Sequence, residues 1–153
     1  MKLRNIISLP VFYEPTATVV GSVKEVVVDD DYRIGYLIIN TNENEVRMIP
    51  SPCFVLSQHA VLINDMASIK PCPVREESTV YEKKVGDLIY DQEGREIGSV
   101  SDFIISREDH RVWGIEVFSG ALNDILQGRS EIPLEQVTWK STSSAVIEPE
   151  RRA

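Results

Sequence analysis

The chain alternates between short apolar runs and polar segments rich in turn-forming residues. The apolar runs are four to nine residues long and rich in Val, Ile, Tyr and Phe, as in Val20–Val28. Runs of this length bounded by Gly, Pro, Asn or Asp are typical of β-strands. Asp91–Gly94 predicts a tight hairpin turn in which Gly94 takes a positive φ, and Asp29–Asp31 and Arg107–His110 predict polar loops between strands.

Helical periodicity is confined to two short segments. Ala121–Leu126 predicts one or two helical turns, and Leu134–Val137 predicts one. Helices this short are not stable in water unless they pack against something else. The pattern therefore predicts an all-β chain with minor short helical turns.

The same order of apolar runs occurs twice along the chain, which predicts an internal repeat. The matching runs are Val11–Glu14 with Leu88–Asp91, Val20–Val28 with Ile97–Ile105, Arg33–Ile39 with Val112–Phe118, Ile49–Pro50 with Ile132–Pro133, and Ala60–Ile63 with Ala145–Glu148. Short antiparallel strands in so small a repeat suit a closed or nearly closed barrel, because closure removes exposed strand edges. We therefore expect two tandem small antiparallel β-barrels.

A segment between the two repeats has the composition of a connector. Pro71 and Pro73 flank Cys72 and a charged run follows, which is typical of a stiff, exposed linker. We place the first repeat at residues 1–70, the linker at 71–82, the second repeat at 83–149 and a tail at 150–153. A barrel of this size has a marginal core. The two barrels are therefore expected to pack against each other or against a second chain.

The ordered set of motifs resembles the PRC-barrel domain family. The second repeat carries the family's motifs in order: Ile97–Val100, Val112–Ile115, Gly120, and the Ile-Pro pair with its following turn in Ile132–Val137. The first repeat keeps Val20–Val23 and Ile49–Pro50. It departs at Asn40–Glu45, where the second repeat has Gly120 and an apolar loop. The resemblance covers nearly the whole chain.

This resemblance implies a fold more than a reaction. Settings known for the family include the cytoplasmic part of the photosynthetic reaction centre H subunit and the C-terminal domain of a small-subunit ribosome maturation factor. In both settings the barrel docks onto other proteins. Fold analogy does not fix function, so the resemblance implies protein docking as the expected kind of role and no particular partner.

Composition and charge narrow the classes of function. The net charge is −8, with 42% hydrophobic and 26% charged residues, as in soluble globular proteins. A nucleic-acid partner is not expected, because phosphate binding rests on clustered Lys and Arg. No apolar run approaches the ~20 residues that cross a bilayer, and the first residues lack the apolar core of a signal peptide. We expect a cytoplasmic protein with no direct membrane insertion.

Residues with catalytic or metal-binding chemistry are sparse. His59 and His110 are the only histidines, and we expect both on the surface because no nucleophile signature lies near either. Cys53 is expected to be a buried small side chain and Cys72 a reduced linker thiol. Acidic turns supply oxygen ligands for hard cations, but Asp also favours turns because its side chain bonds the local backbone. We expect no catalytic, cofactor or metal site.

One apolar segment marks a candidate interaction patch. Leu122, Ile125 and Leu126 would gather on one face of a short helix, in the loop where the first repeat is polar. One interpretation is a plug that closes the end of the second barrel, since apolar residues are usually core. The other is a docking or dimer patch.

These observations together favour a non-enzymatic adaptor that docks onto a partner protein or forms a homodimer. One alternative is a ribosome-biogenesis accessory factor that binds a ribosomal protein, because basic ribosomal proteins would suit an acidic chain. A second alternative is a weak metal-binding or small-ligand-binding protein. An enzyme would need a deep pocket that holds convergent Asp, Glu or His side chains.

Overall fold

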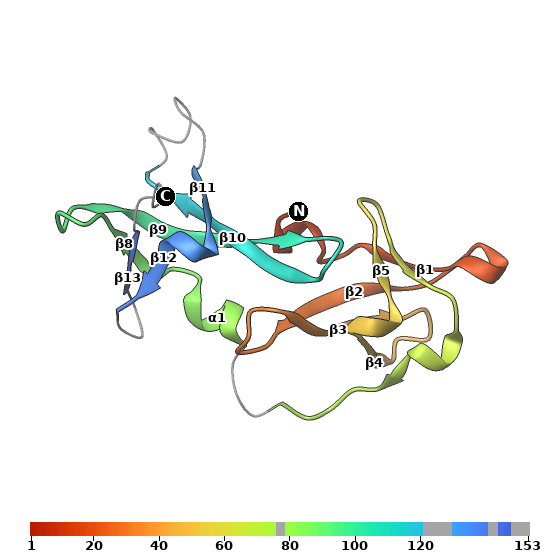
Figure 1. Cartoon of the computed structure of the whole chain (residues 1–153). Coiled ribbons are helices and arrows are strands. Elements are labelled where there is room, and N and C mark those ends of the chain that lie inside the picture. Colours follow the sequence, from red (N-terminus) through yellow and green to blue (C-terminus); the bar gives the residue numbers. More distant parts are fainter. Residues whose placement is uncertain (76–78, 121–129, 141–143, 148–153) are drawn as a thin grey trace. The chain divides into compact units, whose positions relative to one another are not determined.

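The computed structural model describes residues 1–75, 79–120, 130–140 and 144–147. These residues belong to two compact units, each built on one β-sheet (Figure 1). Unit 1 comprises Met1–Val80 together with Ile105–Arg111. Unit 2 comprises Tyr81–Ile104 and Val112–Ala153. A short segment from the second repeat of the sequence therefore belongs to the same compact unit as the first repeat.

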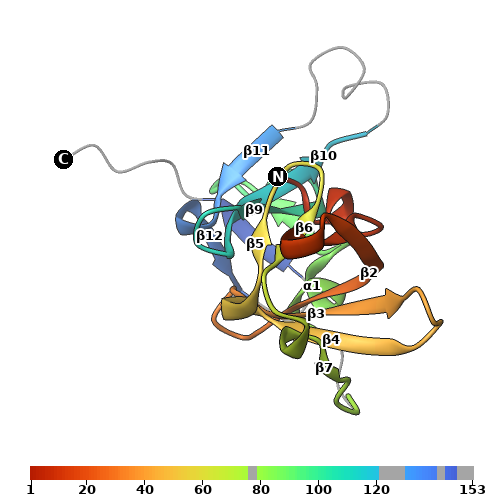
Figure 2. The same cartoon turned by 90° about the vertical axis from the view of Figure 1, so that its right-hand side faces the viewer.

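Unit 1 contains a seven-stranded sheet of order β5-β6-β1-β2-β3-β4-β7, in which β3 and β4 run side by side (Figure 2). The strands are β1 (Pro10–Tyr13), β2 (Thr18–Val28), β3 (Ile34–Thr41), β4 (Val46–Pro50), β5 (Val55–Leu56), β6 (Val61–Ile63) and β7 (Lys70–Pro71). The short 3-10 helix η1 (Leu3–Asn5) precedes the first strand, and three others lie between strands: η2 (Glu14–Thr16), η3 (Ser51–Cys53) and η4 (Met66–Ser68). At η4, Asp65 accepts a hydrogen bond from the Ala67 backbone N–H and so caps the helix start.

Unit 2 contains a six-stranded sheet of order β11-β10-β9-β8-β13-β12. The strands are β8 (Leu88–Tyr90), β9 (Glu96–Ser106), β10 (Arg111–Phe118), β11 (Ser130–Pro133), β12 (Val137–Trp139) and β13 (Ser144–Ile147), with η5 (Leu134–Gln136) between β11 and β12. The helix α1 (Val80–Lys84) precedes β8. The single turn expected at Leu134–Val137 is confirmed by η5. The helix α1 spans the end of the expected linker and the first residues of the expected second repeat, and it was not predicted.

The two sheets have the same strand order, which confirms the internal repeat. Taken from the β12 edge, β12-β13-β8-β9-β10-β11 repeats the order β5-β6-β1-β2-β3-β4 of unit 1. Each sheet also contains one parallel pair, β1 with β6 and β8 with β13. The expected all-β tandem arrangement is confirmed, but these two pairs depart from the expected antiparallel pairing. They join an early and a late strand of each repeat, which no hairpin connects, so their direction leaves no signal in the local sequence.

The hydrogen-bonded ladders place the first pair of matching strands one residue away from the sequence match. Val11 pairs with Gly21, and Ile89 pairs with Gly98 in the same way. Val11 therefore corresponds to Ile89 and not to Leu88. Burial agrees, because Val11 and Ile89 are fully buried whereas Leu88 is 39% exposed. A one-residue slip exchanges the two faces of a strand, so the distinction decides which side chain is core.

The third pair of matching strands is shifted in the same manner. Tyr36 lies opposite Pro50, and Gly114 lies opposite Pro133. Gly114 therefore corresponds to Tyr36, and the match of Gly114 with Gly35 in the sequence is wrong by one residue. The identical glycines hid a one-residue difference in the length of the preceding loop.

Aliphatic side chains of the strands fill the interior of each unit. The completely buried aliphatic side chains are Ile6, Val11, Leu37, Ile39, Ile49 and Val61 in unit 1, and Ile89, Ile115 and Ala145 in unit 2. Full burial of a Val, Leu or Ile side chain contributes about 1.5–3 kcal/mol. The helix α1 adds Tyr81, whose ring meets Phe103 edge-on with the centroids 5.2 Å apart.

Candidate functional site

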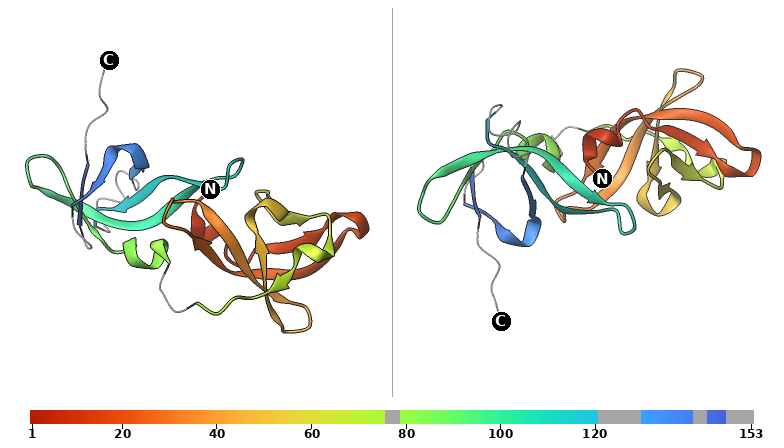
Figure 3. Two further views of the ribbon diagram at one scale, coloured as in Figure 1. Left: turned by 60° about the horizontal axis from the view of Figure 1, so that its bottom comes forward. Right: turned by 90° about the horizontal axis from the view of Figure 1, so that it is seen from above.

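The tip of the β9–β10 hairpin is held within unit 1 by backbone hydrogen bonds. Met1 and Ile105 exchange two bonds, of 3.0 Å from the Met1 nitrogen and 2.6 Å from the Ile105 nitrogen. The Ile34 N–H donates to the His110 carbonyl at 2.8 Å, and Arg33 forms an isolated β-bridge with Arg111. Figure 3 shows this tip beside the segment that carries β5. The tip is therefore part of the folded structure of unit 1.

The His110 side chain contacts two residues of the first repeat, Ser51 and Phe54. Its Nδ1 atom shares a 2.6 Å hydrogen bond with the Ser51 hydroxyl. Its ring also stacks on Phe54, with the centroids 4.5 Å apart and the planes inclined by 14°. The backbone of His110 has a φ of 57°, in the left-handed region that residues other than Gly adopt rarely, although His is enriched there together with Asn and Asp. Two favourable side-chain contacts thus offset an unfavourable backbone conformation.

An open groove of about 750 Å³ lies between this tip and the segment that follows β4. One side is formed by the residues at η3 and β5, namely Ser51, Pro52, Phe54, Val55 and Leu56; the other is formed by Ser106, Arg107, Glu108, Asp109 and His110. Phe54 and Leu56 are buried, whereas the Val55 side chain between them is 59% exposed. The groove therefore combines an exposed aliphatic side chain with a charged wall.

Burial lowers the pKa of His110 below its ordinary value of 6.5, because the charged imidazolium is poorly solvated beside Phe54. The neighbouring Asp109 carboxylate opposes this effect but is the smaller influence. His110 is therefore neutral at neutral pH. In that form one ring nitrogen accepts and the other donates a hydrogen bond.

The two histidines differ from each other in this structure. His59 is exposed, as expected. His110 is only half-exposed and packs on Phe54, so the expectation of a plain surface histidine in a charged loop is wrong for it. Ser51 and Phe54 were not singled out in the sequence. They lie more than 50 residues before His110, and no local motif marks a contact of that range.

The two cysteines are free thiols. Cys53 is half-exposed, so the expectation that it is buried is not met, and its neighbour Phe54 is the buried residue of the pair. Cys72 is also half-exposed.

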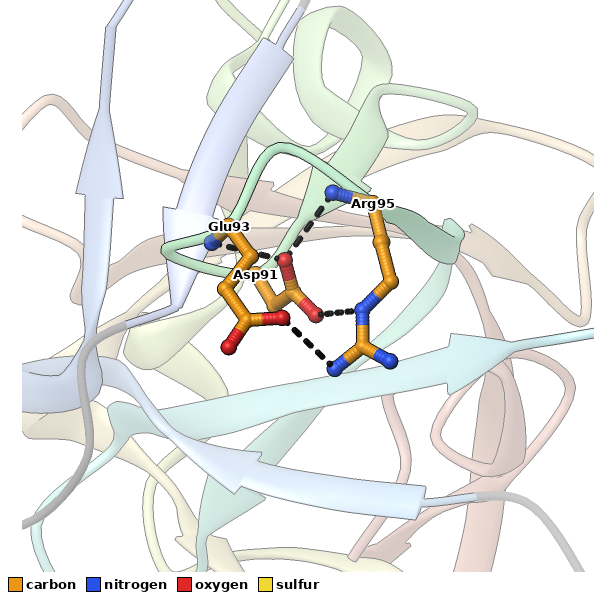
Figure 4. Close-up of polar contacts among 3 residues, drawn as sticks. All are labelled: Asp91, Glu93 and Arg95. Carbon is orange, nitrogen blue, oxygen red and sulfur yellow. Dashed lines mark hydrogen bonds and ion pairs between the residues drawn. The ribbon is translucent and has the colours of Figure 1, made fainter.

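The acidic turns use their carboxylates to bond their own backbone, as predicted. The Asp91 Oδ1 atom accepts hydrogen bonds from the Glu93 and Arg95 backbone N–H groups, both at 2.9 Å (Figure 4). Gly94 in the same turn has the predicted positive φ, of 80°. The Arg95 Nε atom adds a 2.8 Å bond to the Asp91 Oδ2 atom. Asp29 bonds the N–H groups of Asp31 and Arg33 in the same pattern.

These backbone bonds have an electrostatic consequence. The bond from the Arg95 backbone N–H is the largest cause that lowers the pKa of Asp91 below 3.8.

Within residues 1–75, 79–120, 130–140 and 144–147, no group of three or more His, Cys, Asp or Glu side chains is placed to hold a metal ion.

The candidate patch of Leu122, Ile125 and Leu126 lies outside the described residues, as does the short helix expected at Ala121–Leu126. In the part of the chain that the structure covers, no helix combines the length and the apolar character needed to cross a membrane.

The fold and the groove define a β-sheet protein made of two copies of one small strand arrangement, with an open surface groove on unit 1. The family model of the PRC-barrel domain matches residues 1–70 and again residues 81–147. The chain therefore belongs to the PRC-barrel domain family and carries two tandem copies of the domain. No curated protein matches it significantly.

Proposed function

We propose that this chain is a non-enzymatic docking module that binds a partner protein. The observation that carries the proposal is the groove of unit 1, because it is open, leaves Val55 exposed and is bordered by charged side chains. Surfaces of this kind, with an apolar centre and a polar rim, are typical of protein interfaces. The Ser51–His110 pair does not form a hydrolytic triad, because within the described residues the His110 ring has no hydrogen bond to a carboxylate that would orient it as a base.

Two surfaces are candidates for the docking. One is the groove, and the other is the patch of Leu122, Ile125 and Leu126 proposed from the sequence. We propose that the module works in the cytoplasm, where its two free thiols would stay reduced. Self-association into a homodimer is a second mode of docking, and we propose that it would use one of the same two candidate surfaces.

The test is capture of partners from a lysate of the source cells on the immobilised chain. Three proteins are compared: the wild type, Val55→Asp, and the double variant Leu122→Asp with Leu126→Asp. Each must first give the circular dichroism spectrum of the wild type. We expect one protein to be retained by the wild type, to rebind after purification, and to be lost with one of the variants. Light scattering on the same samples measures self-association.

The outcomes separate the alternatives. A purified partner lost with one variant supports the adaptor and locates its surface. A ribosomal protein as that partner would favour the ribosome-biogenesis accessory function. If no protein binds at any salt concentration and the chain is monomeric, the adaptor proposal is wrong. The acidic turns would then be screened with divalent cations and small metabolites.

A further inference from the structure

The strand β5 forms one edge of the unit 1 sheet, and the groove runs along it. Among the strands that the structure describes it pairs with β6 alone, with Val55 opposite Leu62 and Leu56 opposite Val61. Along Phe54, Val55 and Leu56 the side chains alternate between buried and exposed, as in a strand that covers a core with one face. Within residues 1–75, 79–120, 130–140 and 144–147, no strand pairs with the other edge of β5.

The register shows which backbone groups face that open edge. The Ser57 N–H donates to the Ala60 carbonyl at 2.9 Å, so Ser57 and Ala60 are a hydrogen-bonded pair. Bonded and non-bonded pairs alternate along an antiparallel ladder. Leu56 opposite Val61 is therefore a non-bonded pair, and the Leu56 N–H and C=O point away from β6. An unpaired strand edge of this kind is a template for another extended chain.

The charged side chains that line the groove indicate the charge of the segment that it would bind. Glu108 and Asp109 both line the groove and are exposed, and within the described residues neither forms an ion pair. Asp109 accepts only a 3.2 Å hydrogen bond from the Ser106 hydroxyl. Arg107 also lines the groove, but it borders a second hollow with Gln58 and His59 as well. The carboxylates of two neighbouring side chains thus face an occupant, which favours positive charge on it.

We infer that the groove binds an extended cationic segment of a partner protein, which adds to β5 as an extra strand. Its backbone bonds the Leu56 N–H and C=O, an apolar side chain packs against Val55, and a Lys or Arg side chain lies beside Glu108 and Asp109. The inference rests on the proposed docking function and specifies the surface and the chemistry of the partner. Strand addition of this type takes affinity from main-chain bonds and specificity from alternate side chains.

Three capped octapeptides on the full-length chain test the inference. The first alternates Val and Lys, the second alternates Val and Glu, and the third is the Val–Lys peptide with N-methyl groups on all of its amides. Binding is followed by ¹⁵N NMR. We expect the Val–Lys peptide to bind, with the largest shift changes at Leu56 and at residues 106–110. The Val–Glu and N-methylated peptides should bind at least tenfold more weakly, because one reverses the charge and the other loses its donors.

Variants with matched controls locate the site. Val55→Asp removes the apolar contact, and Val46→Asp makes the same change at an exposed valine of β4 outside the groove. Glu108→Lys reverses a wall charge, and Glu43→Lys does so in the β3–β4 turn. We expect Val55→Asp and Glu108→Lys to weaken Val–Lys binding at least tenfold, and the two controls to change it less than twofold.

Three results would overturn the inference: equal binding of all three peptides, shift changes away from β5, or equal effects of variants and controls. Failure of the docking function looks different. A partner that is captured from lysate by Val55→Asp but lost with the Leu122 and Leu126 variant would preserve docking and refute this groove. Absence of any partner, together with absence of peptide binding, would refute both.

Discussion

The contacts of His110 predict how firmly the hairpin tip is held in unit 1. The substitution His110→Asn removes the stack on Phe54 and displaces the partner of Ser51, yet Asn tolerates the left-handed backbone that His110 adopts. The stacking contact is worth about 0.5–1.5 kcal/mol, and the hydrogen bond adds about 0.5–1.5 kcal/mol. We therefore expect the free energy that holds the tip in unit 1 to fall by about 2 kcal/mol. This corresponds to roughly a 30-fold rise in the population of molecules in which the tip is detached.

Hydrogen exchange measured by mass spectrometry is the assay, because it reads each segment separately. Both tryptophans of the chain, Trp113 and Trp139, belong to unit 2 and serve as an independent fluorescence probe of that unit. We expect residues 51–56 and 105–111 to exchange about 30-fold faster in His110→Asn. His59→Asn is the matched control, because His59 is exposed. Equal exchange in the two variants would refute the reasoning.

A double-mutant cycle separates the two contacts. Ser51→Ala removes the hydroxyl that bonds Nδ1 and leaves the stack in place. The coupling energy between Ser51→Ala and His110→Asn should be about 0.5–1.5 kcal/mol, the net worth of one hydrogen bond. A coupling energy of zero would show that the 2.6 Å bond contributes nothing to stability.

The same contact has a pH dependence of defined sign. Burial lowers the pKa of His110 from 6.5, so the unfolded chain binds a proton more readily than the folded one. The stability that His110 contributes is present above pH 6.5 and falls as the pH drops below that value towards the lowered pKa. Wild type and His110→Asn should therefore converge in stability on acidification from pH 7.5 to 5.5, and parallel curves would contradict the assignment.

Three further changes have expected outcomes. Burial raises the pKa of Asp87 above 3.8, more than Lys84 lowers it, so Asp87→Asn should raise the Tm at pH 7, with the difference vanishing below pH 3.8. Backbone hydrogen bonds lower the pKa of Asp91, so Asp91→Ala should lower the Tm at neutral pH and lose its effect as the pH falls through the lowered pKa. A Cβ atom at Gly21 would lie 2.5 Å from the Asn40 carbonyl oxygen, whereas a Cβ atom at Gly35 would lie 3.8 Å from its nearest neighbour, the Val27 carbonyl oxygen. Urea unfolding should therefore show that Gly21→Ala is far less stable than Gly35→Ala.

The sequence predicted the repeat and its order of strands because each strand is a separate apolar run. These runs are rich in the Val and Ile side chains that fill the interior of each unit. The exact residue-to-residue correspondence of the two copies was not predicted. Val11 was matched with Leu88, and Gly114 with Gly35, because the residue types are similar, but the strand ladders are offset from both matches by one residue. Register is a property of paired strands, and one strand by itself does not contain it.

The groove was not predictable for a related reason. Its two sides, residues 51–56 and 106–110, are far apart in the sequence. The charged loop at Arg107–His110 reads locally as an ordinary polar turn, and nothing within it indicates a stacked imidazole. The turn of Asp91 was predictable by contrast, because all its hydrogen bonds join residues within four positions of each other.

The composition of unit 1 gives a reason for the tandem arrangement. One side of the groove comes from the first repeat, and the other comes from the hairpin of the second repeat, yet both belong to one compact unit. A single PRC-barrel copy would have β5 but not the facing carboxylates of Glu108 and Asp109. If the groove is the docking surface, a shortened chain that ends at residue 80 should not bind the Val–Lys peptide, even if its own sheet is intact. The full-length chain, which also contains residues 105–111, should bind the peptide. Duplication of the domain would then have created a binding groove that a single copy of the domain does not have.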